Sequence, residues 1–344
     1  MYDRAERTVR TQEHYRQQRH AAKDVDNLTV EFRTRSGVVK ALEAVTFAIQ
    51  PGETVGIVGE SGSGKSVTAF TLMGVLDRAG KVTAGRALLQ TDRVAVDLLK
   101  EPESSLRQLR GKELSMIFQN PRTALNPIRK VGKQITDVLR CHTSLPKTEL
   151  RAKALAMLAS VRIPDPEKRY NAYPYELSGG LCQRIMIALA LACSPKLLIA
   201  DEPTTGLDVT TQATVMNLVK DLATQQQMAA VLITHDLALA SEYCDRIIVM
   251  HAGHVVESAP TRQLFSHPHH PYTAKLIAAT PEPHKSFADL VPIAGNLPDL
   301  KAADLSPCRF SKRCDRYDPS LCDQAPLPFN SLTPEHQVAC WQPL

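Results

Sequence analysis

The sequence has 344 residues, carries 41 basic and 36 acidic side chains for a formal net charge of +5, and is 43% hydrophobic and 22% charged. This composition excludes a largely disordered chain and a collagen-like chain, and the length favours about two domains. The longest uninterrupted apolar run, residues 185–193, falls short of the ~20 residues needed to cross a bilayer. The modest positive charge suits phosphates, nucleic acid or an acidic membrane surface without choosing among them. We therefore expect a globular chain that does not itself span a membrane.

The first segment, residues 1–24, is a basic arm without the apolar stretch of a signal peptide. We expect a solvated arm, with a basic helix that touches lipid or a partner as the alternative. Export through a cleaved signal is not expected.

The next elements are predicted strands. Residues 28–32 and 45–49 are rich in β-forming side chains and flank a turn at Ser36 and Gly37, which predicts a small antiparallel edge. Residues 54–58 form an apolar strand that runs into a glycine-rich loop and then an apolar helix after Lys65. This order predicts a strand-loop-helix unit.

The middle of the chain is predicted to be helical. Residues 114–118 form a further strand, and apolar positions across 150–161 repeat with helical spacing, so a helical subdomain is expected over about 120–193. Strands return at 197–200, 230–233 and 246–250, separated by segments of helix length. This alternation predicts an α/β fold with a largely parallel sheet.

The composition changes near Ser258, because prolines recur through the rest of the chain. We expect one domain over 25–257 and a C-terminal domain over 258–344. Four cysteines are scattered through the first domain, where buried inert thiols are expected, namely Cys141, Cys182, Cys193 and Cys244. The other four lie in the tail, namely Cys308, Cys314, Cys322 and Cys340.

A phosphate-binding pattern, G-x-x-x-x-G-K-[ST], lies between the strand at 54–58 and the helix after it. Its residues are Gly59, Glu60, Ser61, Gly62, Ser63, Gly64, Lys65 and Ser66. The glycines let backbone N–H groups turn around phosphate oxygens at a helix N-terminus. Lys65 is expected to reach the β and γ phosphates, and Ser66 to supply a Mg²⁺ ligand. The loop predicts ATP or GTP with Mg²⁺.

Two acids end the apolar strand that begins at Leu197. Carboxylates at the carboxyl end of a parallel strand lie where open α/β folds bind ligands. Asp201 suits the Mg²⁺ shell, and Glu202 suits a base that orients and deprotonates the attacking water.

A second anion site is predicted at the start of the apolar helix near residue 181. Ser178, Gly179 and Gly180 place a hydroxyl and bare amides at that helix N-terminus. By itself this pattern is equally typical of an ordinary helix cap.

Taken in chain order, these motifs resemble those of the ABC ATPases. The matching residues are the phosphate loop, Gln119, Leu177-Ser178-Gly179-Gly180, Asp201-Glu202, Thr205-Gly206-Leu207-Asp208 and His235. The resemblance implies a P-loop NTPase fold with a RecA-like core, an antiparallel β edge and a helical subdomain. It also implies that two such domains enclose two ATP molecules, each phosphate loop facing the signature of the partner.

The resemblance also implies individual roles. Gln119 would contact Mg²⁺ and water, Asp208 would lie at the dimer seam, and His235 would hold the γ-phosphate in the transition state. The expected catalytic residues are therefore Lys65, Gln119, Glu202 and His235. Phe32 resembles the aromatic residue that stacks on adenine, with packing in the strand core as the alternative.

The tail is similar to that of ATPases from peptide and nickel importers, through His269-His270-Pro271-Tyr272-Thr273 and the four tail cysteines. This narrower resemblance implies an ATP-hydrolysing subunit that powers peptide uptake from the cytoplasmic face of the inner membrane. Its partners would be a paralogous ATPase, two permease subunits and an extracytoplasmic binding protein, with no nucleic acid. Nickel or glutathione import, an exporter, and a soluble ABC ATPase acting on nucleic acid or ribosomes are the alternatives.

The four tail thiols suit a tetrathiolate site for [4Fe-4S] or Zn²⁺. Disulfides or free thiols are the alternatives. The resemblance implies a [4Fe-4S] cluster held by Cys308, Cys314, Cys322 and Cys340. Such a cluster would serve as a structural staple for the proline-rich tail.

Overall fold

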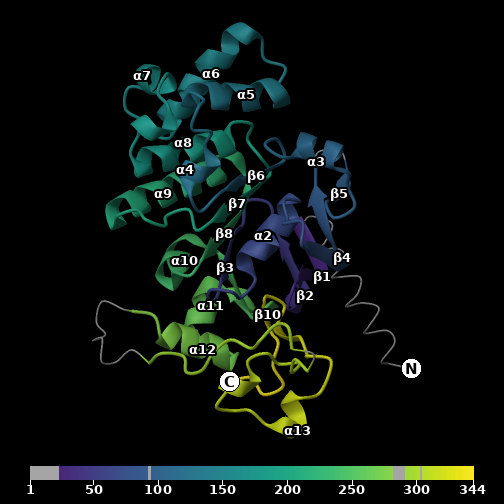
Figure 1. The fold of residues 1–344 in the computed structure, drawn as a ribbon. Coiled ribbons are helices and arrows are strands. Elements are labelled where there is room, and N and C mark those ends of the chain that lie inside the picture. Colours follow the sequence, from purple (N-terminus) through teal and green to yellow (C-terminus); the bar gives the residue numbers. More distant parts are fainter. Residues whose placement is uncertain (1–22, 92–93, 282–290, 303) are drawn as a thin grey trace.

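The computed structural model describes residues 23–91, 94–281, 291–302 and 304–344. The predicted basic arm therefore lies outside the described residues, apart from Lys23 and Asp24. Figure 1 shows three regions: a helical end that contains α5 to α7, two β-sheets in the middle, and the C-terminal tail, in yellow, at the opposite end.

The smaller sheet is antiparallel and has the strand order β2-β1-β4-β5. Its strands are β1 Lys23–Thr34, β2 Gly37–Ile49, β4 Gly80–Gln90 and β5 Ala95–Asp97. Val25, Leu28 and Val30 of β1 are fully buried, so the sheet packs its apolar face inward. The predicted antiparallel edge is confirmed, and both of its strands are longer than the sequence pattern indicated.

The larger sheet has the order β11-β12-β10-β9-β3-β8-β7-β6. Its strands are β3 Thr54–Val58, β6 Leu114–Ile117, β7 Leu197–Asp201, β8 Ala229–Thr234, β9 Arg246–His251, β10 His254–Pro260, β11 Asn330–Thr333 and β12 His336–Val338. The strands from β9 to β6 are parallel, whereas β10, β12 and β11 add antiparallel pairs. The predicted parallel core is confirmed, and its strands end at one shared edge.

Helices cover both sheets and build the helical end. Those before residue 260 are α2 Lys65–Met73, α3 Glu103–Leu109, α4 Pro121–Ala124, α5 Val131–His142, α6 Lys147–Ser160, α7 Pro166–Tyr170, α8 Gly179–Leu191, α9 Val209–Gln226 and α10 Leu237–Tyr243. The tail adds α11 Thr261–Ser266, α12 Pro271–Ala278 and α13 Pro319–Cys322, with short 3-10 turns η1 Pro174–Glu176 and η3 Ser311–Arg313. The stretch expected to be helical contains α4 to α8. No helix in the described part of the chain has both the length and the apolar character to cross a bilayer.

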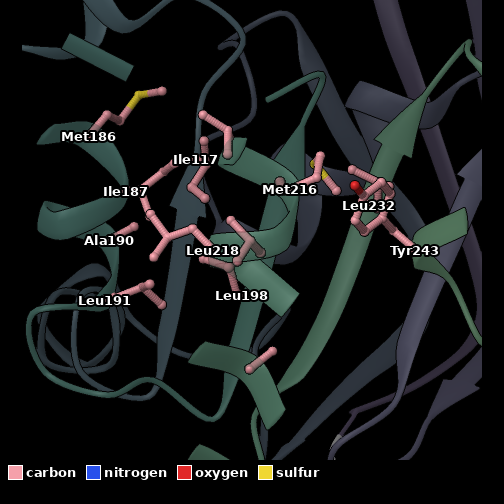
Figure 2. Close-up of a cluster of buried hydrophobic side chains, with 14 of the residues drawn as sticks. Ile117, Met186, Ile187, Ala190, Leu191, Leu198, Met216, Leu218, Leu232 and Tyr243 are labelled. Atoms are coloured by element: carbon pink, nitrogen blue, oxygen red, sulfur yellow. The ribbon is translucent and has the colours of Figure 1, made fainter. Parts of the chain in front are cut away.

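One hydrophobic core joins α8 and α9 to the parallel strands (Figure 2). Ile187 of α8 and Leu198 of β7 are fully buried, and Ile117, Leu218 and Leu232 complete the contact from β6, α9 and β8. Such close packing holds the N-terminus of α8 in a fixed relation to the end of β7.

The tail is joined to the larger sheet through a buried carboxylate. Strand β12 pairs with β10 at Glu257 and Ser258, so the change in composition near Ser258 falls inside a strand. The Glu257 carboxylate accepts hydrogen bonds from the backbone N–H groups of His269 and His270 at 2.7 and 2.9 Å. It also bonds His336 Nε2 at 2.7 Å. A buried acid with three partners fixes α12 and β12 on the sheet.

We expect Leu198→Ala to lower the free energy of unfolding by about 2–5 kcal/mol, because the truncated side chain leaves a cavity beneath the sheet. Urea denaturation measures the loss. Ile128→Ala is the control, because its side chain is 86% exposed and exposed substitutions change stability by about 0.5 kcal/mol or less. Equal losses in the two variants would contradict the packing described here.

Candidate nucleotide site

The phosphate loop connects β3 to α2, and two of its backbone carbonyl groups accept hydrogen bonds from the side chain of Lys65. Lys65 Nζ donates hydrogen bonds to Gly59 O at 2.7 Å and to Glu60 O at 2.9 Å. Glycine is required at position 59, because a Cβ there would lie 2.1 Å from Met250 O at a φ of +148°. Burial lowers the pKa of Lys65, and the neighbouring acids Glu202 and Asp201 oppose that shift. The lysine therefore lies in a partly desolvated position beside two carboxyl groups.

Two oxygen ligands suited to Mg²⁺ lie side by side. Ser66 Oγ, in the first turn of α2, donates to Asp201 Oδ1 at 3.2 Å. Burial raises the pKa of Asp201, while the hydrogen bond from Ser66 opposes the increase. A hydroxyl and a carboxylate are hard oxygen donors of the kind that Mg²⁺ prefers. The two predicted ligands are thus adjacent.

Glu202 is the centre of a hydrogen-bond network that includes two other predicted site residues. Its Oε2 accepts from Gln119 Nε2 at 2.6 Å and from Thr205 Oγ1 at 3.0 Å. Its Oε1 lies 3.0 Å from His235 Nδ1. Burial opposes ionisation of Glu202, but the hydrogen bonds from His235, Thr205 and Gln119 together outweigh it and hold the pKa below its ordinary value. The carboxylate is therefore ionised near neutral pH, as a general base requires.

These residues meet because each follows a parallel strand. Lys65 comes after β3, Gln119 after β6, Glu202 after β7 and His235 after β8. Neighbouring parallel strands end at the same edge of a sheet, so the loops that follow them converge. Asp201 is itself the last residue of β7.

The signature and the Asp208 motif are helix N-caps with exposed surfaces. Ser178 Oγ accepts from Leu181 N at 3.4 Å, and a Cβ on Gly179 would meet nothing within 4 Å. Asp208 accepts from the backbone N–H and the hydroxyl of Thr211 at 3.0 and 2.7 Å. The hydrogen bonds found for Ser178 and Asp208 are local, so both helix ends present open surfaces.

Phe32 is half-buried on β1 and packs against the core of the smaller sheet. Its ring packs against Gly80, because a Cβ added to Gly80 would lie 2.8 Å from a carbon atom of the Phe32 ring. Its expected contact with adenine stays a prediction.

The phosphate loop also contacts the tail, which sequence reasoning missed. The N–H of Glu60 donates to the Tyr272 hydroxyl at 3.0 Å, and both carboxylate oxygens of Glu60 bond Arg313 at 2.8 and 2.9 Å. The hydrogen bonds from Arg313 hold the pKa of Glu60 below its ordinary value although burial opposes the shift. The sequence marked Tyr272 as part of a motif and Glu60 as a variable loop position, but nothing in it joined the two.

The four tail cysteines line one cavity, together with Tyr317 and Trp341. All eight cysteines are free thiols. Burial, and to a lesser extent the other tail thiols, raises the pKa of Cys308 to about 12. Within the described ranges, no three His, Cys, Asp or Glu side chains are placed to hold a metal ion. The expected cluster site is therefore not confirmed, although its four donors face one space.

Comparison with protein families gives two matches. The family described as ABC transporter matches residues 42–205, and the family described as oligopeptide/dipeptide transporter, C-terminal region, matches residues 256–322. The two matches cover the phosphate loop, the signature, the acidic strand end and much of the tail.

Curated relatives match almost the whole chain. A probable peptide ABC transporter ATP-binding protein of Sinorhizobium fredii is 43% identical over 93% of this chain and 94% of its own length. The oligopeptide transport ATP-binding protein OppD of Escherichia coli is 43% identical over 95% of both chains. OppD of Haemophilus influenzae is 45% identical over 88% of this chain and 92% of its own.

Solved structures match the ATPase part. A dimeric ATP-binding cassette, MJ0796, bound to ADP and Pi in a post-hydrolysis state, superposes with a TM-score of 0.62 and 28% identity, covering 70% of this chain and 99% of its own. The protein cbiO1 of Clostridium perfringens, part of the transporter complex cbiONQ, gives a TM-score of 0.59 and 27% identity, covering 72% and 91%.

We expect His235→Ala to raise the pKa of Glu202, because the variant removes the hydrogen bond that lowers this pKa most. Carbon-13 NMR of labelled glutamate side chains measures this pKa, with Glu202→Gln identifying the signal. Since the folded-state pKa of Glu202 is depressed, its ionised carboxylate stabilises the fold at any pH above the ordinary glutamate pKa, and this stabilisation is lost as the pH falls through the folded-state pKa. In His235→Ala the Glu202 carboxylate therefore contributes less to the stability of the fold near neutral pH.

The control is His267→Ala, which removes an exposed side chain whose ring contacts Ser266 Oγ at 2.9 Å. This variant should leave the Glu202 signal in place. An unchanged Glu202 pKa in His235→Ala would contradict the network.

Proposed function

The chain belongs to the ABC transporter family and is an ATPase of that type with the C-terminal region of oligopeptide and dipeptide transporters, and we propose that it powers peptide import. The convergence of Lys65, Asp201, Glu202 and His235 at one sheet edge supports ATP hydrolysis, and the match of residues 256–322 to the oligopeptide/dipeptide transporter C-terminal region carries the proposal of peptide import. Peptides are favoured over nickel or glutathione because the curated relatives reported above are named for peptide or oligopeptide transport.

In the proposed reaction, Lys65 leaves the carbonyl groups of Gly59 and Glu60 and binds the β and γ phosphates. Glu202 accepts a proton from the attacking water, because its carboxylate is ionised and exposed enough to reach solvent, with 19% of the side chain accessible. His235 is held by Glu202 Oε1 and is thereby oriented toward the γ-phosphate. The Glu202–His235 pair would act as one unit.

Mg²⁺ would be held by Ser66 and Asp201, with Gln119 joining after it releases Glu202. When bound, the ion neutralises charge on the phosphates. Phe32 would stack on the adenine from the smaller sheet.

The ATP-binding state would be a dimer. Ser178, Gly179, Gly180 and Asp208 would face the phosphate loop of a paralogous ATPase, and the exposed helix ends at these residues support that arrangement. Two permease subunits and an extracytoplasmic binding protein would complete the importer. The chain would lie at the cytoplasmic face of the inner membrane, with an ATPase domain over 25–257, a helical subdomain over about 120–193 and a tail domain over 258–344.

We expect Glu202→Gln to bind ATP but to hydrolyse it at least about 100-fold more slowly, because a general base contributes 10²–10⁴-fold. Hydrolysis in the assembled transporter, ATP binding by the purified chain and uptake of labelled dipeptide by cells are the measurements. Uptake should fall together with hydrolysis.

The matched control is Glu149→Gln, an exposed acid on α6. Hydrolysis retained by Glu202→Gln would contradict the assignment of the base. Uptake of nickel or glutathione without peptide uptake, or purification with nucleic acid instead of permeases, would contradict the transport proposal.

We propose further that Cys308, Cys314, Cys322 and Cys340 hold a [4Fe-4S] cluster. Four free thiols that face one cavity suit this group, which cysteine thiolates bind. The four thiols would hold the irregular tail together, and their ligation adds no step to ATP hydrolysis.

Anaerobically purified protein is expected to contain about four iron and four sulfide per chain. The double variant Cys308→Ser, Cys314→Ser should lose both, whereas Cys141→Ser, at an exposed cysteine, should keep them. Assays for iron, acid-labile sulfide and zinc distinguish a [4Fe-4S] cluster from a zinc site and from free thiols. Zinc in place of iron, or no metal at all, would contradict the cluster.

A further inference from the structure

Glu60, the second residue of the phosphate loop, is held by two residues of the tail. Its backbone N–H donates to the hydroxyl of Tyr272 at 3.0 Å. Its carboxylate forms two parallel hydrogen bonds with Arg313, at 2.8 and 2.9 Å. The Arg313 side chain is 3% exposed and that of Glu60 is 30% exposed. A two-point arginine–carboxylate pair of this kind fixes the orientation of both groups.

Tyr272 is held in place by contacts within the tail and with β9 that do not involve the phosphate loop. His270 caps helix α12, because its Nδ1 accepts from the backbone N–H of Tyr272 at 3.0 Å. The fully buried Tyr272 ring lies 4.5 Å from the ring of His251 and 5.3 Å from that of Phe310. Glu257 holds the chain just before the helix through its bond to His270 N. The geometry of this short motif thus places the Tyr272 hydroxyl at the phosphate loop.

Arg313 is also held in place from within the tail. It ends the 3-10 turn Ser311–Arg313, and its Nε donates to Ala294 O at 3.0 Å. Its guanidinium lies 5.7 Å from the centre of the Phe310 ring. Its backbone carbonyl accepts from Lys275 Nζ at 3.0 Å. The guanidinium is therefore oriented toward Glu60 by contacts that do not involve the loop.

The same glutamate contacts the loop lysine. The Glu60 carbonyl accepts from Lys65 Nζ at 2.9 Å, while its N–H and carboxylate belong to the tail contacts. A rotation of the Glu60 backbone would therefore break the bond to Tyr272 and move an acceptor of Lys65. This residue links the tail to the group expected to bind phosphate.

We propose that Tyr272 and Arg313 are positioning residues for ATP binding, which hold Glu60 so that the phosphate loop keeps its nucleotide-binding shape. Neither side chain needs to touch the nucleotide. The inference rests on ATP hydrolysis at this loop and does not depend on which solute is transported.

The test measures equilibrium binding of Mg-ATP to the full-length chain, and KM and kcat for ATP in the assembled transporter. Arg313→Ala is expected to raise the dissociation constant and KM about tenfold, the size expected when a charge-assisted hydrogen bond is lost. The kcat should change less, because the residues around Glu202 are untouched. Arg313→Lys should restore part of the affinity.

A double variant tests whether Arg313 acts through Glu60. Glu60→Ala combined with Arg313→Ala should bind ATP no more weakly than the poorer single variant, because the two changes remove one interaction. Lys312→Ala is the matched control, since Lys312 is the exposed neighbour of Arg313. Its ATP affinity should equal that of the unaltered chain.

Tyr272→Phe keeps the buried ring and removes only the hydroxyl, so it tests the second contact without a large packing change. We expect a smaller loss of ATP affinity in the same direction. Melting temperatures are measured for every variant. A lower melting temperature with unchanged ATP affinity and KM in Arg313→Ala and Tyr272→Phe would overturn the proposal. Loss of peptide uptake with normal ATP affinity would also overturn the positioning role, because the two residues would then act on transport and not on ATP binding, while the ATPase assignment would stand.

Discussion

The parallel pairing of β3, β8, β7 and β6 is the constraint on which the nucleotide site depends. Side chains far apart in the sequence meet only because these strands end at one edge. The hydrophobic core beneath them, which includes the fully buried Leu198, holds the strands in that register. The sheet therefore fixes the point from which each loop of the site begins.

The backbone conformation of Glu202 determines which hydrogen bonds its carboxylate accepts, and these bonds determine the direction of its pKa shift. Its φ of +45° places a non-glycine residue in the left-handed region, directly after the buried strand β7. In that position the carboxylate can accept from residues that follow two other strands, Gln119 and His235. The hydrogen bonds then outweigh the effect of burial on its pKa. The same contacts that lower the pKa also orient His235.

The tail is joined to the ATPase domain by strand pairing and by hydrogen bonds to the phosphate loop. Its strand β12 extends the larger sheet through β10, and Glu257 ties that pairing to α12. From this docked position the tail reaches Glu60 in the phosphate loop. Arg313, which makes that contact, immediately precedes Cys314, one of the four thiols that line the tail cavity. The residue that bonds the phosphate loop is thus the immediate chain neighbour of a cysteine that lines the tail cavity.

The sequence by itself determined the local features: the glycine pattern of the phosphate loop, the strand and helix that flank it, and the helix N-terminus at Ser178. These depend on residues within a few positions of one another. It also predicted that the carboxyl ends of the strands would meet, because alternating strands and helices imply a parallel sheet.

Only the tertiary structure decided which atoms meet at that edge and where the tail lies. The partners of Glu202 depend on strand order, and Tyr272 and Arg313 lie 212 and 253 positions from Glu60. The tail strands join the sheet although the composition changes at Ser258. Contacts at such separations are set by the path of the whole chain through the core, which no local pattern encodes.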